Sequence, residues 1–278
     1  MGETELPDGR RLGWAEWGPP DGIPVVLIPG AATSRLLGFG PAAVDALGVR
    51  LVSVDRPGLG VSTPAPAPSF AGFAADMQAF VQLHGLGRPA MVGNSQGAPF
   101  ALACAIAGCC SVLALVSAAD EVASSGFAHV LPPPLRGLVD GVVADPAGAE
   151  RYFAGFSPDA VWSMVGAASP PSDLAVYTAT AFHAAYLRAL ADGFRQGPDG
   201  YARDTVLAMS PWPLALESIT VPVDVWYGAE DTSHSPDRGE TLAARIPDAR
   251  RHVVPGIGGA VLWTNAEMIL RHLLVHTY

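Results

Sequence analysis

The sequence predicts an α/β protein with a doubly wound, mostly parallel eight-stranded sheet and a helical lid inserted after the sixth strand. Short, almost continuous apolar runs recur along the chain, and such runs are typical of parallel strands buried on both faces. Segments with helical spacing lie between them, as in repeated βαβ units. This alternation stops over residues 121–213, where prolines cluster, which indicates an insertion.

The chain is expected to begin with a hairpin, followed by alternating strands and helices. Residues 3–17 alternate polar and apolar side chains across the turn sequence Pro7-Asp8-Gly9, which predicts an antiparallel hairpin at the sheet edge. The other six strands are expected at residues 25–28, 51–54, 90–92, 112–116, 223–227 and 251–254. Helices of the core are expected at residues 36–47, 70–84, 98–107, 238–245 and 265–274.

The chain is therefore expected to form a core from residues 1–120 and 214–278 and a lid from residues 121–213. Bulky apolar side chains recur in the lid at helical spacing, and such a stripe more often packs against a neighbouring domain than lines a substrate wall. Part of the lid should still cover the strand ends, where ligands bind in open α/β sheets. The bulky residues are Trp162, Met164, Tyr177, Phe182 and Tyr186.

Composition limits the class of protein. The 278 residues are 50% hydrophobic and 15% charged, which is enough apolar material for one large globular domain. A net charge of -10, with scattered arginines and no lysine, argues against nucleic acid or an anionic membrane as a partner. The acidic start lacks an export signal and no apolar stretch reaches membrane length, so a cytoplasmic location is expected. Cys104, Cys109 and Cys110 lack metal-ligand spacing and are expected to be packing residues or free thiols.

One motif points to chemistry. Gly93-Asn94-Ser95-Gln96-Gly97 lies between an apolar run and a helical run of small residues, which predicts a strand, a sharp turn and a helix. Glycines flank the serine because a side chain at either position would clash with the neighbouring strand or helix. Such a turn exposes the hydroxyl at the carboxyl edge of the sheet, in front of backbone N–H groups and a helix dipole. Ser95 is therefore a candidate nucleophile.

Three further segments, together with this turn, resemble landmarks of the α/β-hydrolase superfamily in the right order. Residues 29–35 resemble its oxyanion loop after the third strand, and residues 55–62, which begin Asp-Arg-Pro-Gly, resemble the loop after the fourth. Gly228-Ala229-Glu230-Asp231 is similar to the segment that supplies the catalytic acid. The resemblance covers essentially the full chain and is closest in character to esterase-like and iminopeptidase-like members with a helical lid.

This resemblance implies roles for individual residues. Ser95 would be the nucleophile and Asp231 the acid, with Asp120 after the sixth strand as an alternative acid. The backbone N–H groups of Ala31 and Gln96 would form the oxyanion hole, where each donor stabilises a tetrahedral oxyanion by roughly 3 to 4 kcal/mol. No metal or organic cofactor is implied.

The chain departs from the family pattern at the base. After the last strand the family usually has Pro-Gly-x-Gly-His, whereas this chain has Gly259 or Ala260 at the histidine position. A serine hydroxyl without an imidazole is a poor nucleophile at neutral pH.

Three explanations compete for this departure. Another histidine can serve as the base, and His234 is the best candidate because it lies three residues after Asp231 and a triad requires geometry rather than chain order. Alternatively, the histidine was replaced deliberately, most simply at Ala260. In the third explanation, the fold binds a small molecule without turnover, or catalyses a cyclisation or elimination.

The expected function is hydrolysis of a small, apolar, uncharged ester, lactone or related acyl substrate through a Ser95 acyl-enzyme, with His234 as the base. The alternatives are a non-hydrolytic binder, cyclase or lyase, and an inactivated variant of an ordinary hydrolase. A small-molecule substrate is the expected partner, and the sequence leaves its identity and the oligomeric state open.

Overall fold

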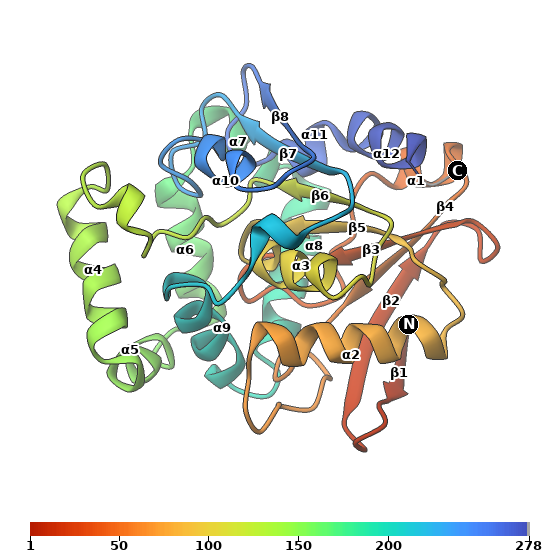
Figure 1. The fold of residues 1–278 in the computed structure, drawn as a ribbon, viewed down its shortest axis with the longest axis horizontal. Helices are drawn as coiled ribbons and strands as arrows, with labels where there is room; N and C mark the ends of the chain where they lie inside the picture. Colours follow the sequence, from red (N-terminus) through yellow and green to blue (C-terminus); the bar gives the residue numbers. More distant parts are fainter. Residues whose placement is uncertain (277–278) are drawn as a thin grey trace.

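The computed structural model describes residues 1–276, which form an eight-stranded sheet in the order β1-β2-β4-β3-β5-β6-β7-β8 (Figure 1). β1 pairs antiparallel with β2, and β2 pairs antiparallel with β4. The remaining neighbours are parallel. The strands span Gly2–Glu5, Arg11–Trp17, Ile23–Ile28, Val49–Val54, Ala90–Asn94, Val112–Val116, Val223–Gly228 and Ala249–Val254.

Helices bury both faces of this sheet. Val26, Val52 and their neighbours on one face belong to the same apolar cluster as α2, α3 and α10. Val25, Leu51 and their neighbours on the other face pack with α1, α11 and α12. Because the central strands are covered twice, their side chains are apolar in both directions, which accounts for the continuous apolar runs. These helices span Pro41–Ala46 (α1), Phe70–Leu83 (α2), Ala98–Ile106 (α3), Glu240–Ala244 (α10), Val261–Thr264 (α11) and Ala266–Val275 (α12).

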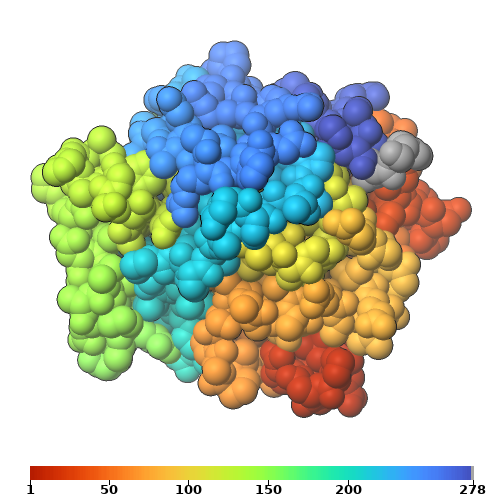
Figure 2. Space-filling view, viewed as in Figure 1, coloured from red at the N-terminus to blue at the C-terminus, as the bar shows by residue number. Residues whose placement is uncertain are grey.

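A helical insertion, defined as α4 to α9, lies between β6 and β7. Its first helices form the left flank of the molecule in Figures 1 and 2. The proline clusters have a local explanation, because α4, α5, α6 and α7 each have a proline in the first helical positions, where a missing N–H costs nothing. The helices span Pro133–Ala144, Pro146–Phe153, Pro158–Ala168, Pro171–Tyr177, Thr180–Gly193 and Asp199–Met209.

The predicted doubly wound sheet, its hairpin and its strands are confirmed, whereas one helix was predicted too long. The helix expected at residues 36–47 begins only at Pro41. Gly40 before it adopts φ 54°, a left-handed conformation outside the helical region, and Gly38 lies against the ring of Trp17. The short α11 was not predicted. No helix within residues 1–276 has both the length and the apolar character needed to cross a membrane.

Candidate active site

The turn around Ser95 has the strained geometry that the flanking glycines predict. Ser95 follows β5 with φ 49°, which is rare for a residue with a side chain. A Cβ on Gly93 would lie 2.7 Å from Ala101 Cβ, and a Cβ on Gly97 would collide with the carbonyl oxygen of Ile28. The absence of side chains at both positions therefore allows α3 to pack closely enough to present Ser95 at the carboxyl edge of the sheet.

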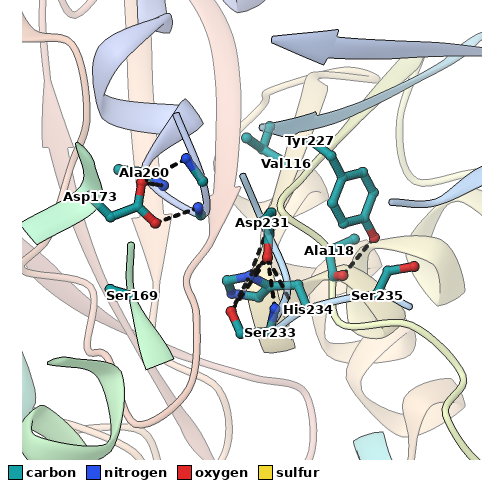
Figure 3. A network of polar contacts seen from close by, with 12 residues as sticks. Val116, Ala118, Ser169, Asp173, Tyr227, Asp231, Ser233, His234, Ser235 and Ala260 are labelled. Carbon is teal, nitrogen blue, oxygen red and sulfur yellow. Dashed lines mark hydrogen bonds and ion pairs between the residues drawn. The ribbon is translucent and has the colours of Figure 1, made fainter. Parts of the chain in front are cut away.

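The loop after β7 brings Asp231 and His234 together (Figure 3). The Nδ1 atom of His234 lies 3.0 Å from each carboxylate oxygen of Asp231. Because an ionised carboxylate only accepts hydrogen bonds, Nδ1 carries the proton and Nε2 is left as an acceptor. The same carboxylate accepts the backbone N–H groups of Ser233 and His234, so the loop is folded around Asp231.

Each member of this pair changes the pKa of the other. Burial alone would raise the pKa of Asp231, but the charge of His234, its hydrogen bond and the loop N–H groups lower it below the ordinary 3.8. Burial alone would lower the pKa of His234. The charge and hydrogen bond of Asp231, together with the charge of Asp173, outweigh burial and raise it above the ordinary 6.5.

The imidazole of His234 occupies the space beside Gly259. A Cβ added to Gly259 would lie 2.7 Å from His234 Cε1, which is too close for two carbon atoms. It would also lie 3.3 Å from His234 Nδ1. Gly259 also lines the same cavity as Ser95 and His234, whereas Ala260 is fully buried in the apolar cluster beneath α11. A side chain at residue 259 and the observed position of the His234 ring thus exclude each other.

Residues 119 and 120 connect the turn at Ser95 to the loop after β7 that carries Asp231 and His234. The Ala119 N–H donates to the Ser95 carbonyl at 3.0 Å, and the Asp120 N–H donates to the His234 carbonyl at 3.1 Å. The Asp120 carboxylate accepts from Ser235 Oγ at 2.8 Å and from the Glu121 N–H, and its bonded partners do not include the His234 ring. Burial raises the pKa of Asp120 to about 6 despite these hydrogen bonds.

Asp173 holds the loop in which the family places its histidine. This residue belongs to α7 of the insertion and is 1% exposed. Its carboxylate accepts three successive backbone N–H groups, from Gly258 at 2.9 Å, Gly259 at 2.6 Å and Ala260 at 3.2 Å. Figure 3 shows Asp173 facing this loop, across from the pair formed by Asp231 and His234. One carboxylate therefore fixes the loop and adds negative charge near the imidazole.

The predicted oxyanion residues lie beside the serine and are braced by Arg56. A Cβ on Gly30 would lie 3.3 Å from Ser95 Cβ, so the loop that carries Ala31 lies against Ser95. The fully buried Arg56 guanidinium donates to the carbonyls of Pro29 and Gly30 and to Gln96 Oε1. It also pairs with Asp204 of α9 at 2.6 Å. Arg56 thus joins the oxyanion loop, the serine turn and the insertion.

A cavity of about 350 Å³ connects these groups. Ser95, Ala31, Gln96 and His234 all line it, and α4 to α9 supply much of the remaining wall. The predicted bulky apolar side chains fall into two groups: Tyr177, Tyr186 and Met164 line the cavity, while Phe182 and Trp162 pack beside them. Within the described residues, no three metal-ligating side chains converge on this cavity.

The sequence does not predict the contacts of Asp173 or the bracing role of Arg56. Arg56 belongs to the segment at residues 55–62 that begins Asp-Arg-Pro-Gly, but its partner Asp204 lies 148 residues away. Asp173 follows two prolines in the insertion, and nothing in the local sequence indicates that it faces residues 258–260.

Comparison with known proteins agrees with this architecture. A model of the alpha/beta hydrolase fold family matches residues 23–266. An esterase from Thermogutta terrifontis is 20% identical with a TM-score of 0.72, and the match covers all of both chains.

Two other solved structures give similar values. An esterase from Rhodococcus sp. is 20% identical with a TM-score of 0.70 over 99% of this chain and 98% of its own. An enol-lactonase from Burkholderia xenovorans is 18% identical with a TM-score of 0.68 over 99% of each chain. No curated protein sequence matches the chain. The structural likenesses show the fold, and because the family model spans most of the sequence, the chain belongs to the α/β-hydrolase fold family.

Proposed function

We propose that the protein is a serine hydrolase that cleaves a small, apolar, uncharged ester, lactone or related acyl substrate, with Ser95 as nucleophile, Asp231 as acid and His234 as base. The esterase and enol-lactonase neighbours support hydrolysis in general. The observation that carries the specific proposal is the His234 ring, which is bonded to Asp231 through Nδ1 and fills the space beside Gly259.

The proposed reaction is acyl transfer to Ser95 followed by hydrolysis of the acyl-enzyme. Ser95 Oγ attacks the carbonyl carbon while His234 Nε2 takes the hydroxyl proton. The N–H groups of Ala31 and Gln96 stabilise the oxyanion, and His234 returns the proton to the departing alkoxide. Water then attacks the acyl-enzyme with His234 again as base, which releases the acid and restores the hydroxyl. The insertion serves as a lid that excludes bulk water from this cavity.

The site geometry weighs against the two alternatives. An ordinary hydrolase inactivated at residue 259 or 260 would not need a second imidazole in the space of the first. A passive binder has no need for a histidine whose Nδ1 is held by a carboxylate and whose Nε2 is free to accept a proton. In both cases the arrangement of Asp231 and His234 favours an active base.

Labelling with a fluorophosphonate tests the proposal. The intact protein should be labelled on Ser95, and Ser95→Ala should abolish labelling. His234→Ala and Asp231→Asn should slow it by about 10³-fold or more, because the hydroxyl loses its proton acceptor or that acceptor loses its orientation. Asp120→Asn is the matched control and should react at nearly the normal rate.

The possible failures are distinguishable. A folded protein that is not labelled would refute the hydrolase proposal. Normal labelling of His234→Ala would refute only the assignment of the base. If Asp120→Asn were slowed and Asp231→Asn were not, Asp120 would be the acid.

A further inference from the structure

Two histidines and an aspartate converge at the opposite end of β7 from the proposed active site. Asp224 is the second residue of this strand, His252 lies on β8 and His272 lies in the last turn of α12. One side-chain ligand atom from each residue lies within 4.8 Å of the other two. Within residues 1–276, the ion pairs of Asp224 are with these two histidines and with no arginine.

We propose that Asp224, His252 and His272 form a binding site for a divalent transition-metal ion of the zinc class. This site is independent of the proposed hydrolase activity. Two imidazole nitrogens and one carboxylate oxygen are a ligand set that suits Zn²⁺ and its first-row neighbours. Water would occupy the fourth position, because the histidine side chains are 23% and 42% exposed.

The three side chains lie close enough to hold an ion after small shifts of their atoms. Asp224 Oδ2 and His272 Nδ1 are 3.9 Å apart, which is too long for a hydrogen bond. Ligand atoms around a tetrahedral zinc ion, at bond lengths of about 2.0 to 2.2 Å, are roughly 3.3 to 3.6 Å apart. Asp224 Oδ1 and His252 Nε2 are hydrogen-bonded at 2.6 Å. An ion would replace this bond: the two atoms would separate slightly and the imidazole proton would pass from Nε2 to Nδ1.

Trp226 orients the two imidazoles. Its ring stacks on His252 with a centroid distance of 3.9 Å and an interplanar angle of 12°, and it meets His272 edge-on at 5.1 Å and 90°. Trp226 is itself buried against α12. Both rings are therefore held by packing before any ion binds, which lowers the entropy cost of coordination. A bound ion would link α12 to β7 and β8 and stabilise the C-terminal helix.

Zinc binding to the full chain tests this site. Calorimetric titration with Zn²⁺ should give one ion per chain, with a rise in Tm when zinc is present. His272→Ala removes a partly exposed side chain from a helix end, so the variant should fold, bind zinc at least about tenfold more weakly and lose the rise in Tm. His129→Ala, which removes an exposed histidine of the chain, should behave like the unmodified protein.

Tryptophan fluorescence locates the ion. Ni²⁺ should quench part of the emission because Trp226 contacts both histidines, and the quenching should be lost in His272→Ala and reduced in Trp226→Phe. The proposal fails if no zinc binds at millimolar concentration or if His272→Ala binds as tightly as the unmodified protein. It also fails if His234→Ala abolishes binding and His272→Ala does not, because the ion would then lie in the active-site cavity.

Discussion

At the scale of single residues, the proposed activation of Ser95 depends on the pair formed by Gly259 and His234. Gly259, one of the two residues at which the family's usual histidine is expected, carries no side chain, and the imidazole of His234, from the loop after β7, lies beside it. The small size of Gly259 is therefore as important to the proposed base as the identity of His234.

Replacing Gly259 with alanine should reduce kcat by about 10²-fold or more. The new methyl group would lie 2.7 Å from His234 Cε1 and displace the ring, so that proton transfer loses its geometry. Gly166→Ala in α6 is the matched control, since its added Cβ meets no atom within 4 Å. Steady-state ester hydrolysis compares the two variants, and an unchanged kcat in Gly259→Ala would contradict the proposed role of the ring.

The pH dependence of activity should report the raised pKa of His234. Only the neutral imidazole accepts the Ser95 proton, so kcat/KM should fall as the pH is lowered through a midpoint above 6.5. The pKa of Asp120, about 6, lies close to this range and needs a separate control. In Asp120→Asn, kcat/KM should still fall at low pH. If this fall disappears in the variant, the titrating group is Asp120 rather than His234.

At the scale of elements, Asp173 connects helix α7 of the insertion to the loop before α11. Its carboxylate accepts three buried N–H groups, and an amide in its place would turn an N–H group toward one of these donors. The same carboxylate is one of the charges that raise the pKa of His234.

Asp173→Asn should therefore change two measurements. Stability should fall by about 1 to 3 kcal/mol in denaturant unfolding, because a buried donor loses its partner. The fall of kcat/KM at low pH should also shift to a lower midpoint, because the pKa of His234 loses the raising effect of this charge. Ser172→Ala is the matched control, because it removes an exposed hydrogen bond from the same helix to Glu230 and should change neither measurement appreciably. If stability falls but the midpoint of the pH dependence of kcat/KM does not change, Asp173 acts only by holding the loop at residues 258–260.

At the scale of the whole molecule, the charge distribution predicts a preference for neutral substrates. The chain has a net charge of -10, and the cavity is lined by the carboxylates of Asp120 and Asp173 but by no arginine. An acyl group that carries its own carboxylate would be repelled in a poorly solvated site.

Neutral p-nitrophenyl butyrate should therefore be cleaved with a kcat/KM about 100-fold higher than that of the p-nitrophenyl monoester of succinate at pH 8. Asp120→Asn should narrow this difference by removing one of the two charges. Equal rates for the two esters in the unmodified protein would disprove the electrostatic preference.

The sequence alone was sufficient for the sheet, the hairpin and the turn at Ser95. These features depend on local patterns: apolar runs for buried strands, a turn sequence at residues 7–9, and glycines where α3 approaches the sheet. The helix at residues 36–47 was predicted too long because packing of Gly38 against Trp17 is a tertiary contact.

Only the tertiary structure decided which groups meet. It paired His234 with Asp231 rather than with Asp120, and it placed the ring where Gly259 leaves room. It also brought Asp173 to residues 258–260 and gathered Asp224, His252 and His272 at the other end of β7. The physical reason is that these contacts join segments far apart in the chain, and their distances are set by strand register and helix packing rather than by local spacing.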